Sequence, residues 1–166
     1  LEVAGRSKIP VYKGAEYALD GIHRPCFSVF GKDGMGDMDL IHPQGKAQSK
    51  AAVDFMLETI QKYPGEIEIV ALGPVTNIAT AIQKDPKTMS QVKRIWLMGT
   101  AGFGHGNATP VAEFNVYKDP RACKILTDFQ VPTTIIGLDV CNEPGALYSS
   151  NDLADLAKVS PLADFN

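Results

Sequence analysis

The chain of 166 residues has neither a long apolar run nor a cluster of positive charge. No apolar stretch approaches the roughly 20 residues of a membrane-spanning helix, so no membrane span is predicted. Lysines and arginines are scattered singly in a chain of formal net charge −3, which excludes the basic stripe that tracks a nucleic-acid backbone. The first residues also lack the regions of a signal peptide, and a cytoplasmic location is expected.

Cysteine and histidine are scarce and poorly spaced for a metal site or a disulfide framework. The three cysteines contain no C-x-x-C pair; they are Cys26, Cys123 and Cys141. No two histidines lie four residues apart, so the spacing does not support zinc; they are His23, His42 and His105. We expect reduced, mostly buried thiols.

The glycine-rich stretches lack the spacing of common phosphate-binding motifs. "GKDGMGDMD" at 31–39 is not a G-x-G-x-x-G that follows a strand, and "HPQGKAQS" at 42–49 has only the Gly-Lys of a P-loop. A dinucleotide-dependent oxidoreductase is therefore disfavoured. We expect a turn or flap at 31–39 with solvated carboxylates, namely Asp33, Asp37 and Asp39.

Short β-rich runs alternate with helical patterns along the chain. Strands are predicted at 9–14, 66–72, 94–99 and 133–139, and helices at 46–61, 77–84 and 120–129. This order predicts an α/β fold with an open, mainly parallel sheet and helices on both faces. We expect residues 1–166 to be part of a single domain. Both ends of the chain look like interrupted helical segments, which indicates an interior piece of a longer protein and an incomplete sheet.

One long loop carries an unusual concentration of polar side chains. Residues 100–115, "TAGFGHGNATPVAEFN", follow a predicted strand, and ligands of parallel sheets gather where strands end. Asn107, Glu113 and Asn115 offer the amide and carboxylate groups that hold several hydroxyl groups, such as those of a sugar. Taken singly they have simpler interpretations: Asn107 shapes a turn, Glu113 is solvated and Asn115 caps a helix.

Several segments together resemble the nucleoside hydrolase family, of the inosine-uridine-preferring type. They are "ALGPVTNIATAI" at 71–82, "VKRIWLMGTAGFGHGNATPVAEFNVYKDPRAC" at 92–123 and "TTIIGLDV" at 133–140. "LEVAGRSKIPVYKGA" at 1–15 and "FGKDGMGD" at 30–37 fit as well, so the resemblance covers essentially the whole chain. Its most specific part is N-x-x-P-x-x-E-F-N at 107–115.

The resemblance implies hydrolysis of the N-glycosidic bond of ribonucleosides to ribose and free base, a role in purine and pyrimidine salvage, and a calcium ion that holds the ribose and the attacking water. By position, it assigns ribose binding to Asn107, Glu113, Asn115, Met98 and Phe114. It assigns one calcium ligand here, the main-chain carbonyl of Thr76. The family's aspartate motif and its leaving-group histidine would lie outside residues 1–166, so we expect no catalytic acid or base within the chain and no activity from these residues alone.

Two positions depart from the family pattern. Phe30 stands where histidine is usual in the glycine loop, and Thr100 stands where a second glycine is common. An alternative from another class is a non-catalytic nucleoside- or sugar-binding protein that kept the ribose-binding wall. The base preference and the formation of a homo-oligomer are left open by the sequence.

Overall fold

The computed structural model describes residues 1–24, 31–32, 36–37 and 42–159. The elements are, in chain order, β1 (Tyr12–Lys13), β2 (Gln48–Ala51), α1 (Ala52–Lys62), β3 (Glu68–Ala71), α2 (Thr76–Lys84), α3 (Pro86–Met89), β4 (Arg94–Met98), α4 (Phe114–Lys118), α5 (Pro120–Asp128), β5 (Thr133–Ile136), α6 (Leu138–Cys141), the 3-10 helix η2 (Pro144–Ala146) and α7 (Ser150–Val159). Strands and helices alternate, as the sequence pattern indicates.

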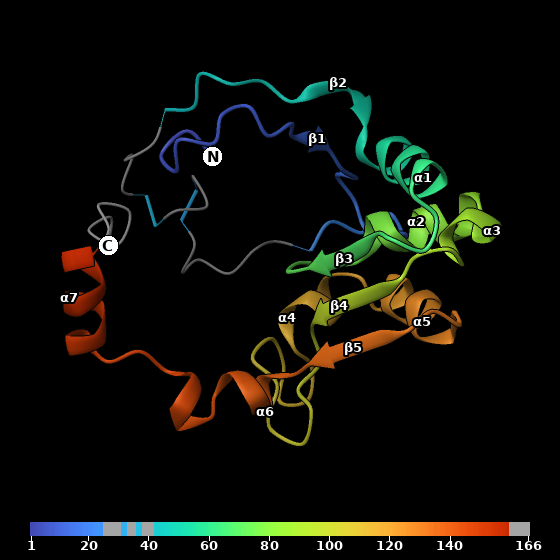
Figure 1. Ribbon diagram of the computed structural model, residues 1–166. Coiled ribbons are helices and arrows are strands. Elements are labelled where there is room, and N and C mark those ends of the chain that lie inside the picture. Colours follow the sequence, from blue (N-terminus) through green and yellow to red (C-terminus); the bar gives the residue numbers. More distant parts are fainter. Residues whose placement is uncertain (25–30, 33–35, 38–41, 160–166) are drawn as a thin grey trace.

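The strands form two parallel sheets (Figure 1). β1 pairs with β2, and the second sheet has the order β3, β4, β5 with β4 in the middle. The register aligns Ile69 with Ile95 and Leu97 with Ile135. Helices connect β3 to β4 and β4 to β5, as crossover connections between parallel strands usually do. The predicted fold class, α/β with parallel strands, is confirmed.

The core lies between the three-stranded sheet and helices α1, α2 and α5. These helices lie together on one side of the sheet in Figure 1. β4 alternates between buried and half-buried residues, and its buried Ile95 and Leu97 face the helices. Ile60 of α1 and Leu126 of α5 are fully buried, and burying a side chain of this size stabilises the fold by about 1.5–3 kcal/mol.

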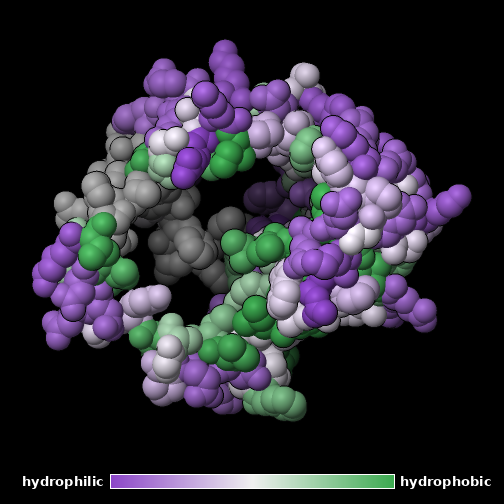
Figure 2. All heavy atoms as spheres, in the orientation of Figure 1, coloured by the Kyte–Doolittle hydropathy of each residue, from purple (hydrophilic) through white to green (hydrophobic). Residues whose placement is uncertain are grey.

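Burial is weaker on the opposite side of the sheet in the part of the chain that the structure describes. Val70 is 63% exposed, and Leu72, directly after β3, is 78% exposed. Figure 2 shows apolar side chains gathered beside an open hollow of the molecule. None of the described helices is both long enough and apolar enough to cross a membrane.

The strand expected over 9–14 is limited to Tyr12–Lys13. Two further predicted segments differ from the structure. Helix formation was expected over 46–61, but Gln48–Ala51 is extended because it pairs with β1, and the helix begins only at Ala52. The strand expected over 133–139 ends at Ile136, where Gly137 becomes the N-cap of α6. In both places pairing and capping contacts override the local pattern.

Two helices begin in the same way, with an aspartate followed by proline. Asp85 accepts a hydrogen bond from the Thr88 N–H before α3, and Asp119 accepts one from the Ala122 N–H before α5. Proline suits the first helical position because it has no N–H to leave unpaired. The thiols Cys123 and Cys141 are free, and burial raises the pKa of Cys123. Cys26 lies outside the described residues.

Candidate active site

The carboxyl ends of β3, β4 and β5 share one edge of the sheet, and Asn115 lies over the first two of them. Its side-chain nitrogen Nδ2 donates to the main-chain carbonyl of Met98 at 3.1 Å and lies 3.3 Å from the Met98 sulfur. The same nitrogen is 3.5 Å from the carbonyl oxygen of Leu72, at the outer limit of a hydrogen bond. Asn115 therefore fixes the first turn of α4 to the end of the sheet.

Glu113 is the N-cap of α4 and is 2% exposed. Its Oε1 accepts from the Asn115 N–H at 2.8 Å, and its Oε2 accepts from the Val116 N–H at 3.1 Å. The simple interpretation of a solvated Glu113 is wrong, and so is the assignment of the cap to Asn115. The carboxylate is buried because both oxygens satisfy N–H groups that the helix leaves unpaired.

The long loop before α4 folds back on itself and brings Asn107 to the same helix end. The Asn107 side-chain oxygen Oδ1 accepts from the Phe114 N–H at 2.8 Å. Ala112 closes the loop, because its carbonyl accepts from the N–H groups of Asn107 and Ala108 at 3.1 Å and 2.9 Å. The structure thus brings Asn107, Glu113 and Asn115 together at the start of α4, although the first and the last are eight positions apart.

Phe114 and Met98 lie beside these polar groups and are both half-buried. Phe114 is the first residue of α4, and the Lys118 ammonium lies 5.7 Å from the centre of its ring. Met98 is the last residue of β4. The positions of both residues suit the apolar part of a wall that Asn107, Glu113 and Asn115 line with polar groups. The family resemblance predicts that these five residues bind ribose, and we call them the wall.

Thr76 lies just after the turn that follows β3, and its main-chain carbonyl stays a predicted calcium ligand. It is the first residue of α2, and its main-chain carbonyl accepts from the Thr80 hydroxyl at 2.8 Å. The carbonyls that meet Asn115 are instead those of Met98 and Leu72. Sequence reasoning missed Leu72, although its place at the end of a predicted strand and directly before "GPVTN" was a usable signal.

Thr100 shapes the base of the long loop, and the sequence alone offered no interpretation of it. Its φ angle is 73°, a left-handed conformation that glycine adopts freely and a β-branched residue adopts rarely. Its carbonyl accepts from the Leu138 N–H at 3.0 Å. Thr100 therefore ties the loop to the residues after β5 at a cost in backbone strain.

Asp139 holds the same loop from the other side. Its carboxylate accepts from the Phe103 N–H at 3.2 Å. A Cβ atom at Gly102 would lie 2.1 Å from the Asp139 carboxylate, so only glycine fits there. Through Phe103 and Gly102, Asp139 joins the loop after β4 to the residues after β5. These three residues were not singled out from the sequence.

Metal ligands are sparse in the described residues. Within 1–24, 31–32, 36–37 and 42–159, no group of three or more histidine, cysteine, aspartate or glutamate side chains is placed to hold a metal ion. Calcium usually takes about 6–8 oxygen ligands, of which the resemblance assigns one, the Thr76 carbonyl, to this chain. Phe30, Asp33 and Asp39 lie outside the described residues.

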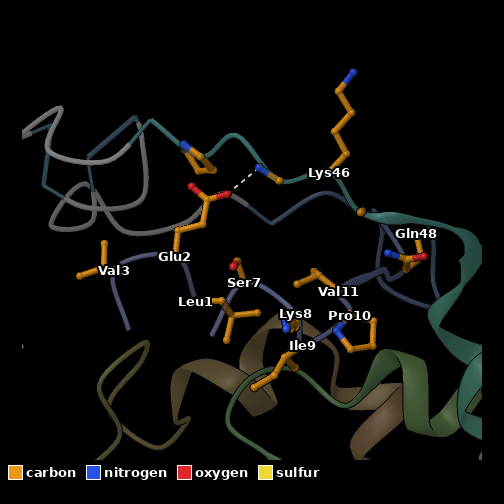
Figure 3. A pocket seen from close by; sticks show the side chains of 13 residues that line it. Leu1, Glu2, Val3, Ser7, Lys8, Ile9, Pro10, Val11, Lys46 and Gln48 are labelled. Atoms are coloured by element: carbon orange, nitrogen blue, oxygen red, sulfur yellow. Dashed lines mark hydrogen bonds between the residues drawn. The ribbon is translucent and has the colours of Figure 1, made fainter. Parts of the chain in front are cut away.

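A separate cavity of about 370 Å³ lies near the N-terminus, between the segments before β1 and before β2 (Figure 3). Leu1, Ile9 and Val11 contribute apolar surface to it. Its carboxylate, Glu2, accepts from the N–H groups of Gln44 and Gly45, which lowers the Glu2 pKa. This cavity is built from other segments than the wall, and its carboxylate, Glu2, is already engaged in holding the two segments together.

Comparisons with known proteins find similarity over most of the chain. The chain matches the model of the inosine-uridine preferring nucleoside hydrolases over residues 1–165. Uridine nucleosidase 1 of Arabidopsis thaliana is 39% identical over 156 residues, which are 93% of this chain and 46% of the relative. A pyrimidine-specific ribonucleoside hydrolase of Citrobacter koseri is 37% identical over 143 residues, which are 86% of this chain and 46% of the relative.

Solved structures show the same similarity. A plant nucleoside hydrolase superposes with a TM-score of 0.86 at 34% identity, over 95% of this chain and 50% of its own. A purine-preferring ribonucleoside hydrolase from Gardnerella vaginalis superposes with a TM-score of 0.77 at 36% identity, over 83% and 45%. The chain spans about half the length of the curated relatives it matches. The order of elements agrees with this family, and the family model matches nearly the whole chain. The chain therefore belongs to the inosine-uridine preferring nucleoside hydrolase family.

Proposed function

We propose that the protein hydrolyses the N-glycosidic bond of ribonucleosides and releases ribose and a free base. The observation that carries the proposal is the convergence of Asn107, Glu113 and Asn115 at the start of α4, over the ends of β3 and β4. This edge is where parallel α/β sheets bind their ligands. Family membership supports the reaction class.

The wall has hydrogen-bonding capacity left for a sugar. Among the described residues, the Asn115 side-chain oxygen accepts no hydrogen bond and the Asn107 side-chain nitrogen donates none. These groups can accept from one ribose hydroxyl and donate to another. Because each amide is held by its other end, the free end has a fixed direction before the substrate arrives, which lowers the entropy cost of binding.

Glu113 contributes negative charge in a place from which water is excluded. A glycosidic bond breaks through an oxocarbenium-like sugar that carries positive charge. A buried carboxylate beside that sugar stabilises the charge more strongly than a solvated one, because the surrounding dielectric constant is low. The two α4 N–H groups hold the carboxylate in place.

Calcium is part of the proposal only for the complete protein. Among the described residues, no group of three or more histidine, cysteine, aspartate or glutamate side chains is placed to hold the ion. The proposal requires that ligands from outside residues 1–166 form the site, together with main-chain oxygen at the strand ends. The wall residues then bind and orient the ribose.

The decisive experiment uses the protein expressed from its complete open reading frame. Uridine is the first substrate to test, because the Arabidopsis relative is named a uridine nucleosidase, and inosine is the second. Chromatography of free base, with a parallel assay of ribose, measures turnover, and Asn115→Ala is the control. Release of both products supports the proposal. Nucleoside binding in a calorimeter without release would favour the non-catalytic binding protein instead.

We also propose a cytoplasmic location and a role in purine and pyrimidine salvage. The reaction turns a nucleoside into a base that the cell can use again, and free nucleosides are small metabolites that need no membrane anchor on the enzyme. Fractionation of cells that carry a tagged complete protein tests the location. Recovery of the protein in the membrane or secreted fraction would overturn it.

A further inference from the structure

Asp119 is a buried carboxylate that lies four residues after Asn115 and joins three parts of the chain. Its side chain is 1% exposed. Its Oδ1 accepts from the Ala122 N–H at 2.9 Å, and its Oδ2 accepts from the Thr76 hydroxyl at 2.7 Å and from the Leu19 N–H at 2.9 Å. The start of α5, the start of α2 and the segment 15–24 therefore meet at one side chain.

The number of donors explains why a carboxylate occupies this position. Capping α5 needs one acceptor oxygen, which asparagine supplies as well as aspartate. Asp119 uses its second oxygen for two further donors, whereas the second terminal atom of asparagine is an N–H donor. All three donors are uncharged, so burying the carboxylate is costly, and the dipole of the nine-residue α5 offsets only part of that cost.

The segment 15–24 is anchored to the same elements at two more points. The Ala15 N–H donates to the Asn77 side chain at 2.8 Å, and the Arg24 guanidinium donates to the Lys118 carbonyl at 3.2 Å. Asn77 belongs to the first turn of α2, and Lys118 is the last residue of α4. The contacts of Asp119 therefore lie at the centre of a cluster that sets α2, α4 and this segment against one another.

We propose that Asp119 is a positioning residue for the wall and acts through Asn115. α4 has only five residues, with Asn115 in its first turn and Asp119 directly after its last residue. Asp119 holds that end to Thr76, which follows the turn after β3, while Asn115 holds the other end to β4. The inference rests on the proposed function, because it assigns Asp119 a role in the orientation of the ribose.

The chain offers a matched control in Asp85. Asp85 also precedes a proline at a helix start, caps the N–H of Thr88 at 2.9 Å and accepts from the Thr88 hydroxyl at 2.6 Å. It differs in having no contact with segment 15–24 and no wall residue on an adjoining helix. A change of aspartate to asparagine at the two sites therefore separates the loss of a cap from the loss of positioning.

The test compares Asp119→Asn with Asp85→Asn in the complete protein, on uridine, 2′-deoxyuridine and 3′-deoxyuridine. A displaced wall lowers the reaction rate, because a small error in the placement of reacting groups reduces the rate by about 100-fold. We expect Asp119→Asn to lower kcat/KM on uridine by about 10- to 100-fold, and Asp85→Asn to change it by less than about 2-fold. Asp119→Asn should also reduce the preference for uridine over at least one deoxyuridine, which a general loss of stability would not do.

Each outcome decides one statement. An inactive wild-type protein that binds no nucleoside overturns the proposed function and this inference with it. If the wild-type protein is active, two results overturn the positioning role alone. One is an equal fold-loss of kcat/KM on uridine in Asp119→Asn and Asp85→Asn, and the other is an unchanged preference of Asp119→Asn for uridine over both deoxyuridines. If Asp119→Asn does not fold, Thr76→Val serves as the second variant, because it removes the hydroxyl that donates to Asp119 and keeps the Asp119 cap of α5. We expect Thr76→Val to lower kcat/KM by a smaller factor and to change the sugar preference in the same direction. An unchanged preference in Thr76→Val overturns the role.

Discussion

The side-chain amide of Asn115 donates to the main-chain carbonyl of Met98 at 3.1 Å and so joins the first turn of α4 to the last residue of β4. A residue of a long loop and helix is thereby fixed to a rigid strand. Binding groups held by packed strands keep their direction better than groups held by a loop alone. The relationship explains how a loop of irregular sequence can present a precise set of hydrogen-bonding groups.

Loss of the wall residues should cost activity. In the complete protein, Asn115→Ala or Glu113→Gln is expected to lower kcat/KM by about 100-fold or more, as the loss of one transition-state hydrogen bond often does. Steady-state kinetics on uridine and inosine measures the effect. Unchanged rates for both variants on both nucleosides would remove these residues from the wall.

Glu113→Gln should also cost stability, which the sequence alone gives no reason to expect. The buried carboxylate caps two N–H groups, and glutamine turns an N–H group toward one of them. An unsatisfied buried polar group costs about 1–3 kcal/mol. Urea unfolding measures the free energy of unfolding, and Glu143→Gln at an exposed position is the control. Equal stabilities of the two variants would contradict the capping role.

Thr100→Gly is expected to stabilise the complete protein by about 1 kcal/mol. The substitution relieves left-handed backbone strain, which costs about 1–3 kcal/mol, and glycine loses part of that gain through its greater freedom in the unfolded state. Thr100→Ala keeps a Cβ atom at the same φ angle, so it should give no such gain. Urea unfolding of both variants measures the difference. A destabilised Thr100→Gly beside an unchanged Thr100→Ala would show that the position is not strained.

His105 should not be the acid that protonates the departing base. It is exposed between Gly104 and Gly106, and general acid catalysis needs a donor held within hydrogen-bond reach of the leaving group. His105→Ala in the complete protein is expected to change kcat/KM by less than about 3-fold, far below the loss that follows removal of a general acid. Abolished turnover with intact binding of a ribose analogue would make His105 the acid.

Residues 1–166 alone are expected to show neither a saturable calcium site nor nucleoside hydrolysis. Among the described residues no carboxylate cluster is placed for a metal, and calcium needs about 6–8 oxygen ligands. We also expect this piece to aggregate, because the exposed Val70 belongs to β3, an edge strand that offers unpaired backbone groups. Calorimetric calcium titration and a ribose assay test the first statement, and light scattering tests the second. Calcium binding with turnover would place the catalytic carboxylates within the chain.

The type and order of four elements followed from the sequence by itself. The patterns at 66–72, 94–99, 77–84 and 120–129 predicted β3, β4, α2 and α5 to within two residues at each end, because hydrophobic period and capping residues are local properties. The motif N-x-x-P-x-x-E-F-N likewise pointed to the wall, because its residue types and spacing can be read along the chain. Family membership could be inferred on the same local grounds.

Only the tertiary structure decided what each polar group contacts. Glu113 is a buried cap and not a solvated side chain, and the Leu72 carbonyl meets the Asn115 side chain. Asp119 accepts hydrogen bonds from Thr76 and Leu19, which are 43 and 100 positions away from it in the chain. Such contacts depend on strand register and on the packing of helices that are distant in sequence. No pattern within a short window contains that information, because the energy of each contact is set by groups that only the folded chain brings together.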